Sequence, residues 1–481
     1  MITQRSPLAA YDPTAFWDEM FSAPGVVRPH YAALARRLET LSAQEVTRRQ
    51  RAADLSFQAR GITFAVNQDP SGLEKIMPFD LVPRIILPEE WERIERGLEQ
   101  RVRALNLFLH DVYHEQKILG SGLIPPELVL GARGYRREVR SVEPPLGVYT
   151  HVVGSDLVRD HRGEFYVLED NLRVPSGVSY VVENRRVLKR VWPQIFTDYP
   201  IRPVEGYPQD LLSVLREVAP PIADTATVVL LTPGVHNSAF FEHAFLAKAM
   251  GIEMVQGSDL FVDDATVYMR TTSGRQRVDV IYRRVDDDFM DPLAFRRDSF
   301  LGVPGLLATY RMGRVSLANA LGTGVADDKA IYAYVPTIIK FYLGEDEIIP
   351  NVKTYIAADP SERTYILEHI AELVVKSVNA SGGYGMLIGP HASKADREDY
   401  RRRIEADPRG YIAQPTLALS RHPSWSDGSL EGRHVDLRPY VLFGKEIRVT
   451  PGGLTRVALR AGSLVVNSSQ GGGAKDTWVL G

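Results

Sequence analysis

Two acidic residues and an asparagine could together bind a magnesium ion. Asp156 lies in one apolar stretch, and Glu169 and Asn171 lie at the end of the next. Side chains alternate between the faces of a strand, so the spacing Glu-x-Asn places both on one face, and across a hairpin Asp156 reaches the same side. Two carboxylates and an amide oxygen suit Mg²⁺, which shares its coordination with substrate phosphates. The alternative is a hairpin whose acidic side chains only face solvent.

A second stretch could bind phosphate. Residues 374–378 form a largely β-branched run that carries Lys376 toward a loop with three glycines in four positions, Gly382, Gly383 and Gly385. Glycines let backbone N–H groups approach an anion, and a lysine adds a charge with three donors. The pattern is neither a P-loop nor a dinucleotide-binding fingerprint. A glycine-rich turn after a buried strand is the alternative interpretation.

Composition excludes several classes of protein. The chain has 57 Lys and Arg residues against 60 Asp and Glu residues and a net charge of −3, which argues against a nucleic-acid-binding protein. Without cysteine it has no disulfide, thiolate metal site or cysteine nucleophile. The 11 histidines show no pair at zinc-ligand spacing with a second cluster, so we expect oxygen ligands for any metal. No apolar run is long enough to span a membrane and the N-terminus lacks a leader pattern, so we expect a soluble, cytoplasmic protein.

The elements that must position these residues follow from hydrophobic periodicity. Helical patterns occupy residues 14–60 and 88–110, the second with Pro88 in its first turn. Strand-like alternation from residue 147 predicts an antiparallel hairpin that contains Asp156 and Glu169.

The remainder alternates between the two kinds of element. Strands and helices between residues 226 and 284 predict a small, mostly parallel sheet. The last third predicts a helix after Lys329, the strand of Lys376, further strands and a helix over 393–406. We expect the polar, glycine-rich tail at 468–475 to be a mobile flap or linker.

Three phrases of the sequence resemble a known family. MPFDLVPR at 77–84, EDNLRVPSG at 169–177 and RHVDLRP at 433–439 are similar to those of circularly permuted bacterial ATP-grasp proteins, which are often compared with glutathionylspermidine synthetases. The resemblance covers roughly residues 60–480. It implies an α+β or α/β chain with a permuted ATP-grasp fold, a small α/β domain of the kind that precedes the ATP-grasp part, and an N-terminal helical region.

The resemblance also implies roles for particular residues. Lys329 and Lys376 would contact ATP phosphates beside the glycine loop, Gln414 would lie near the adenine, and Asp156, Glu169 and Asn171 would hold Mg²⁺. In ordinary ATP-grasp proteins the metal ligands follow the lysines, whereas here they precede them. The stretch containing Asn467, a candidate nucleotide-binding residue, looks like the segment that normally runs into the metal hairpin, so joining Gly481 to about residue 147 would restore the usual order.

Arginine roles are open on the sequence alone. Arg438 could contact the transferred phosphoryl group or pair with Asp436. Arg283, with Arg284, could bind a substrate carboxylate at a strand end or belong to a surface charge cluster. Arg173, just past Asn171, is a weaker candidate of the same kind. Glutathionylspermidine synthetases carry an arginine two residues before the first metal aspartate, where this chain has Gly154, so an arginine that steadies an acyl phosphate must come from elsewhere.

The expected activity is an ATP- and Mg²⁺-dependent carboxylate–amine ligase that forms an amide through an acyl phosphate. The substrates would be small-molecule or peptide carboxylates and amines, without nucleic acid or membrane, and the sequence does not indicate the oligomeric state. Alternatives are a phosphotransferase and a non-catalytic nucleotide-binding partner of a peptide-modifying operon. We expect four segments, listed in order: a mainly helical region at 1–146, the metal hairpin at 147–200, an α/β substrate domain at 201–325 and the nucleotide-binding part at 326–481.

Overall fold

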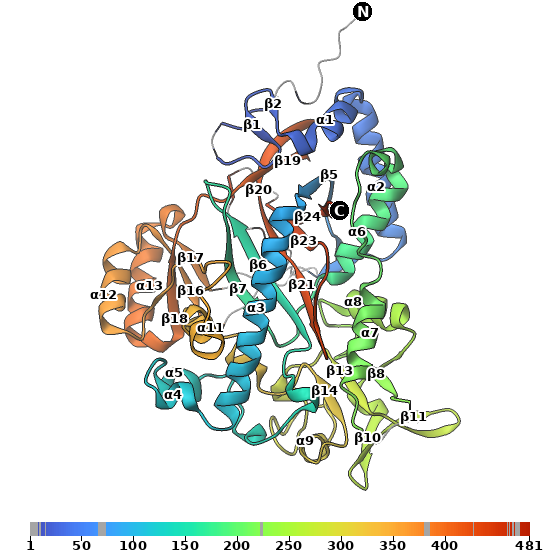
Figure 1. Cartoon of the computed structure of the whole chain (residues 1–481), viewed down its shortest axis with the longest axis vertical. Coiled ribbons are helices and arrows are strands. Elements are labelled where there is room, and N and C mark those ends of the chain that lie inside the picture. The colour runs from blue at the N-terminus through green and yellow to red at the C-terminus, as the bar shows by residue number, and fades with distance from the viewer. Residues whose placement is uncertain are drawn as a thin grey trace, which may run out of the picture.

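The computed structural model describes residues 8, 11–14, 16–65, 74–221, 225–379, 385–426, 428–458, 460, 462–463, 466 and 472–481. Its central element is a nine-stranded sheet in which seven strands run in the order β22-β21-β6-β20-β23-β24-β5, while β7 pairs with β6 and β19 with β20 (Figure 1). The strands are β5 (Phe79–Ile86), β6 (Val152–Arg159), β7 (Phe165–Asn171), β19 (Arg421–Ser426), β20 (Ser429–Arg438), β21 (Tyr440–Phe443), β22 (Ile447–Val449), β23 (Leu454–Val457) and β24 (Gly473–Val479).

A core packs against each face of this sheet. Leu157 and Leu437 belong to the core that includes the apolar stripe of α3 (Pro88–Tyr113), the long helix in front of the sheet in Figure 1. Tyr440 and Leu454 belong to the second core, together with residues of α2 (Ala43–Ala59), α6 (Val178–Val191) and α7 (Tyr207–Glu217). Because side chains alternate along each strand, these apolar residues also determine which face of the sheet the neighbouring polar side chains occupy.

A second sheet confirms the predicted parallel unit. It runs β14-β13-β8-β9, and every pairing in it is parallel. Its strands are β8 (Val228–Leu231), β9 (Glu253–Val255), β13 (Val280–Arg283) and β14 (Ser316–Ala318), with α8 (Phe240–Met250) between β8 and β9. A three-stranded antiparallel sheet of β10 (Leu260–Asp263), β11 (Thr266–Thr271) and β12 (Gly274–Arg277) extends from it.

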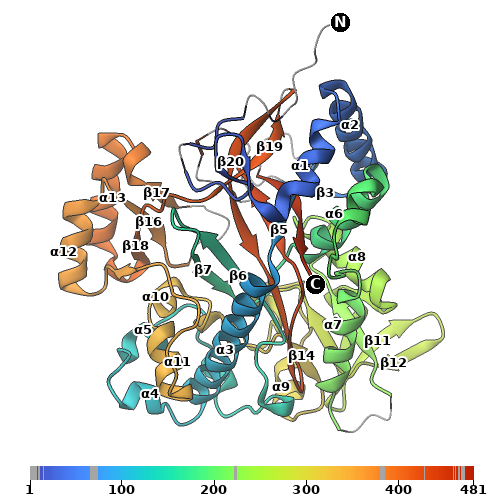
Figure 2. The same ribbon diagram turned by 45° about the horizontal axis from the view of Figure 1, so that its top comes forward.

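The strand of Lys376 belongs to a third sheet in a separate lobe (Figure 2). Its order is β15-β18-β16-β17, from β15 (Tyr355–Ile356), β16 (Leu373–Ser377), β17 (Met386–Ile388) and β18 (Tyr411–Pro415). Helices α12 (Pro360–His369) and α13 (Lys394–Ala406) cover it, and Ile366 and Ile404 pack with Val375 in a small core.

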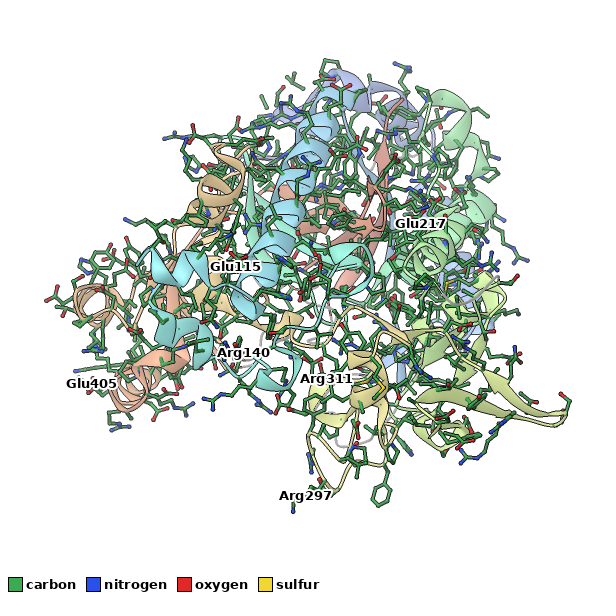
Figure 3. All side chains as sticks on the ribbon, turned by 60° about the horizontal axis from the view of Figure 1, so that its bottom comes forward. Glu115, Arg140, Glu217, Arg297, Arg311 and Glu405 are labelled. Carbon is green, nitrogen blue, oxygen red and sulfur yellow. The ribbon has the colours of Figure 1, made fainter. Side chains whose placement is uncertain are left out.

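The other α-helices and two short hairpins lie outside these sheets. They are α1 (Ala32–Glu39), α4 (Lys117–Gly120), α5 (Pro126–Leu130), α9 (Leu306–Arg311), α10 (Lys329–Tyr332), α11 (Val335–Leu343) and the hairpins β1 (Phe21–Ala23) with β2 (Val26–Val27) and β3 (Thr63–Ala65) with β4 (Glu74–Ile76). None of the described helices is both long and apolar enough to cross a membrane. Exposed charged side chains such as Glu405 and Arg297 point outward at the periphery (Figure 3).

Two sequence expectations were wrong. The helical pattern over 14–60 contains β1 and β2 before two separate helices, α1 and α2. In the tail expected to be mobile, residues 468–471 lie outside the described residues, but Gly473 begins β24. Lys475 is fully buried there, and its ammonium lies 3.0 Å from a carboxylate oxygen of Asp80. The central sheet takes strands from three of the four predicted segments, and the segment boundaries stay a prediction.

Candidate active site

A cavity of about 560 Å³ lies where the three sheets approach one another, a volume typical of small-molecule sites. The central sheet contributes Glu169, Asn171, Arg438, Leu454 and Arg456. The loop after β13 and the segments around it contribute residues of both charges, namely Arg133, Arg136, Arg173, Asp286, Asp287, Asp288 and Asp327. Val378 and Asn379, just after β16, close the side toward the third sheet.

The hairpin of β6 and β7 places the predicted oxygen ligands as the spacing indicates. Asp156 lies opposite Glu169, and Gly154 lies opposite Asn171. The register shifts beside this pair, because Leu157 lies opposite Val167 and Leu168 has no partner in β6. Val167 therefore points into the α3 core while Glu169, two residues later, shares the face of Asp156. Glu169 and Asn171 reach the cavity from this face, and Asn171 donates to the carbonyl of Gly154 at 3.1 Å.

Both predicted lysines lie near the hairpin although they come from other elements. The Lys329 ammonium, at the start of α10, is 3.7 Å from a carboxylate oxygen of Glu169. Lys376 is half-buried, and it donates to the side-chain carbonyl of Gln414 at 2.7 Å. Desolvation by burial lowers the pKa of Lys376 to about 8. The nearby Glu169 carboxylate opposes this shift, and the positive charge of Lys329 adds to it.

Gln414 has a defined position on β18. It is buried, lies opposite Val374 in β16, and donates to the Thr354 hydroxyl at 2.9 Å. Gly385, which precedes β17, has a φ of +65°, a conformation that glycine adopts readily. Gly382, Gly383 and Asn467, which we also predicted to contact the nucleotide, lie outside the described residues.

A row of alternating charges crosses three neighbouring strands. Arg438 of β20 donates to both carboxylate oxygens of Asp156 in β6, at 2.5 and 2.8 Å. Arg456 of β23 donates to Asp156 at 2.7 Å and also pairs with Asp436 of β20. Burial opposes ionisation of Asp156, but the two guanidinium groups hold its pKa well below the usual range. Arg438 thus pairs with Asp156, whereas Arg456 bonds to both Asp156 and Asp436.

Gly154 makes room for Arg438. A Cβ atom at this position would lie 3.3 Å from Cδ of Arg438 and 3.3 Å from Cβ of Pro175. The Arg438 side chain remains 13% exposed, and its guanidinium nitrogen is 4.0 Å from Glu169. An arginine from the neighbouring strand therefore lies directly beside Gly154.

The structure does not support a substrate-binding role for Arg283. Its side chain is fully buried, and its nitrogens donate to the backbone carbonyls of Asn319, Val285 and Ala320. Arg284 is also buried and bonds to Tyr282 and Glu242. The guanidinium groups of both arginines are thus bonded to groups within the protein, although the loop that follows them lines the cavity.

Several cavity residues were not singled out from the sequence. Arg456 carries no local signal, because only the register of β20 and β23 places it opposite Asp436. Arg136 lies in a loop and bonds to Asp288 at 2.6 Å. Arg173, a weaker candidate from the sequence, bonds to Asp327 at 3.0 Å beside the cavity. The sequence signal for Arg173 was its position just past the predicted metal ligand Asn171.

Comparison with known proteins adds the family. Residues 83–458 match the model of the circularly permuted ATP-grasp type 2 family. This chain belongs to that family. The permuted ATP-grasp fold predicted from the sequence is confirmed, and membership indicates an ATP-dependent ligase in general.

Individual proteins resemble the chain to different extents. A Synechocystis protein named without a function is 56% identical over 98% of both chains. A Frankia casuarinae protein with the provisional name glutamate–cysteine ligase 2-2 is 44% identical over 98% of this chain, but the match spans 54% of the Frankia protein. The solved structure of a glutathione synthetase-like effector from Globodera pallida superposes with a TM-score of 0.59 over 92% of this chain and 98% of that one. At 11% identity this likeness concerns the fold alone.

Proposed function

We propose that this chain is a carboxylate–amine ligase that activates a carboxylate with ATP as an acyl phosphate and then forms an amide. The observation that carries the proposal is that Lys329, Lys376 and Arg438 lie near Glu169 although they come from distant parts of the chain. Glu169 and Arg438 line the cavity. Phosphoryl transfer requires positioned cations and excluded water more than a covalent nucleophile. The absence of cysteine is compatible with such a reaction, because no covalent nucleophile is needed.

Each cationic side chain would contact a different part of the triphosphate. In the proposal, adenine lies near Gln414, and Lys329 and Lys376 neutralise the α- and β-phosphate oxygens. Arg438 reaches the cavity from the opposite sheet, so it would meet the γ-phosphate and the acyl phosphate formed from it.

Two of the three predicted oxygen ligands would hold a magnesium ion. Glu169 is 25% exposed and Asn171 lines the cavity, so their oxygens would hold the ion. The Asp156 oxygens accept from Arg438 and Arg456, so Asp156 would serve chiefly to orient these two arginines unless one of them moves. A bound Mg²⁺ would neutralise charge on the β- and γ-phosphate oxygens.

The proposed reaction has two steps. A substrate carboxylate oxygen attacks the γ-phosphorus, and the bond to the bridging oxygen breaks to release ADP. An amine then attacks the carbonyl carbon of the acyl phosphate, loses a proton and displaces inorganic phosphate, which keeps the attacking oxygen of the carboxylate. Mixed charge around the cavity, with Arg133 and Arg173 near Asp286 and Asp288, suits a substrate that carries both a carboxylate and an amine.

A screen for ADP release tests the proposal. Purified protein is supplied with Mg-ATP and pooled carboxylates and amines, and the product is identified by mass spectrometry. The name of the Frankia relative makes glutamate and cysteine the first pair to test, although that name belongs to a protein of which this chain matches about half.

Isotope transfer separates the ligase from a phosphotransferase. With ¹⁸O in the carboxylate, the ligase places one ¹⁸O atom in the released phosphate and yields an amide. A phosphotransferase leaves a phosphorylated acceptor and releases no phosphate. Absence of both an amide and labelled phosphate, with ADP still formed, would refute the ligase.

A further inference from the structure

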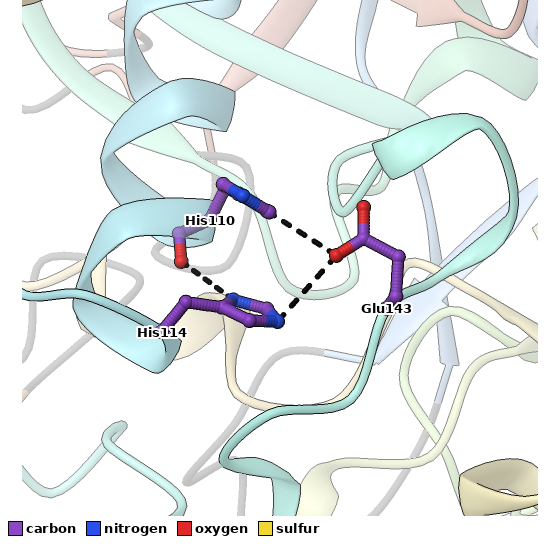
Figure 4. A group of neighbouring side chains, drawn as sticks. All are labelled: His110, His114 and Glu143. Atoms are coloured by element: carbon purple, nitrogen blue, oxygen red, sulfur yellow. Dashed lines mark hydrogen bonds and ion pairs between the residues drawn. The ribbon is translucent and has the colours of Figure 1, made fainter.

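A second polar cluster lies at the far end of α3. His110, in the last turn of the helix, and His114, directly after it, face Glu143 in a loop (Figure 4). Nδ1 of His110 is 3.5 Å and Nε2 of His114 is 3.4 Å from the same carboxylate oxygen of Glu143. The three possible ligand atoms all lie within 4.8 Å of one another.

Those separations fit a shared cation better than direct hydrogen bonds. Charge-assisted N–H···O bonds are about 2.7–2.9 Å long, clearly shorter than either contact. Ligand atoms that surround zinc tetrahedrally at about 2.0–2.1 Å are roughly 3.3 Å apart. The distances from Glu143 to both imidazoles are close to this edge length.

A backbone hydrogen bond also selects the tautomer of one imidazole that a metal requires. Nδ1 of His114 is 2.8 Å from the backbone carbonyl of His110, which can only accept a hydrogen bond. Nδ1 therefore carries the proton, and in the neutral ring Nε2 presents its lone pair toward Glu143. A carbonyl that orients a histidine in this way is the usual second partner of a metal-binding imidazole.

We propose that His110, His114 and Glu143 bind a divalent transition-metal ion of the zinc class, with water completing the coordination. Imidazole nitrogens favour zinc-like ions, whereas Mg²⁺ prefers oxygen, so the site would be distinct in position and selectivity from any magnesium at the cavity. All three side chains have exposed surface, 43%, 21% and 58% respectively, so an ion can enter from solvent. The expectation of oxygen ligands alone did not foresee this cluster, because Glu143 comes from a loop that the sequence does not place beside the helix.

The position of the site suggests what the ion would do. The loop that carries Glu143 also carries Arg133 and Arg136 at the cavity wall. Existing bonds already fix this loop to α3, from the Ser141 amide to the Tyr113 carbonyl at 3.0 Å and from the Arg136 amide to the Tyr113 hydroxyl at 3.1 Å. A bound ion would add a further connection and restrain the wall.

Metal uptake by tag-free protein tests the proposal. After chelator treatment and dialysis against Zn²⁺, the wild-type protein should hold one more equivalent than H114A or the double variant H110A/H114A, measured by elemental analysis. H236A, which removes an exposed histidine elsewhere, should retain the wild-type stoichiometry. Excess Mg²⁺ should not displace the ion.

A spectroscopic readout keeps the result independent of activity. With Co²⁺ as the probe, the wild-type protein should show visible d–d absorption that H114A lacks, and E143Q should weaken binding by at least about 10-fold. Equal Zn²⁺ uptake by the wild-type protein and the double variant, or an unchanged Co²⁺ spectrum in H114A, would overturn the proposal. Because no nucleotide is used, neither result depends on the proposed ligase activity.

Discussion

Glu169 is the acidic residue that the central sheet contributes to the cavity lining. It lies between the Lys329 ammonium, at 3.7 Å, and the Arg438 guanidinium, at 4.0 Å. Glu169→Gln keeps the shape of the side chain but removes the charge that would hold Mg²⁺. We expect ADP release to fall at least about 100-fold while ATP binds with an affinity closer to that of the wild type.

Kinetics and nucleotide titration of the same preparations check this prediction. The control is Glu405→Gln, which changes an exposed residue of α13 and should leave both quantities unaltered. Wild-type turnover by Glu169→Gln would show that the metal assignment is wrong.

Lys376 should make nucleotide binding depend on pH. Its pKa of about 8 in the free protein means that the ammonium is present below that value and is lost as the pH rises through it. Because the charged form binds phosphate, ATP affinity should be constant below pH 8 and fall by up to about tenfold per pH unit above it.

Titration calorimetry between pH 7.5 and 9.5 measures this slope. Lys376→Arg keeps its charge throughout and should lose the slope, while Lys376→Met should bind weakly at every pH. Parallel slopes in the wild-type protein and both variants would assign the titration to another group.

The close approach of Gly154 and Arg438 gives a test that leaves every charge in place. A methyl group at position 154 would press on Arg438 Cδ and Pro175 Cβ, each 3.3 Å away, so the guanidinium must shift. We expect Gly154→Ala to lower kcat by about 10-fold with little change in the Kd of ATP, because misplaced charge weakens transition-state stabilisation first. Gly120→Ala, where a Cβ meets nothing within 4 Å, is the matched control. An unaltered kcat would remove Arg438 from the transfer step.

At the level of elements, the sequence predicted helix α3 but not strand β24. The helix α3 was predictable because Pro88 and a regular apolar stripe mark it locally. The strand β24 was missed because Gly473 and Lys475 are typical of loops. The buried Lys475 ammonium is bonded to Asp80 and to the carbonyls of Val82 and Pro423, all from distant segments. Likewise, alternation predicted the hairpin of Glu169, but no local pattern encodes the strand register that pairs Arg456 with Asp436.

The terminal strand should also be important for stability. Trp478 in β24 is fully buried and contacts the rings of Phe196 and Tyr199, with centroid distances of 4.8 and 5.5 Å. Trp478→Ala should lower the free energy of unfolding by about 3–5 kcal/mol, since it leaves a large cavity. Phe300→Ala, at a position 91% exposed, should have no effect. Denaturant midpoints that agree for the two variants would contradict the placement of β24 in the core.

On the scale of the whole molecule, permutation separates in sequence what the fold brings together. The hairpin of Glu169 belongs to the central sheet, and Lys376 belongs to the lobe of β16. Sequence motifs predicted the order of these segments, but only the three-dimensional structure shows that they lie close together. The cavity between them also explains why the substrate was not predictable, because its wall combines loops such as those of Arg136 and Asp288.

A crystal structure with Mg²⁺ and a non-hydrolysable ATP analogue tests the central claim most directly. The account predicts one triphosphate with Lys329 and Lys376 on one side and Glu169, Asn171 and Arg438 on the other. A nucleotide bound elsewhere, or one that contacts the lysines while Glu169 and Arg438 face away from its phosphates, would contradict it.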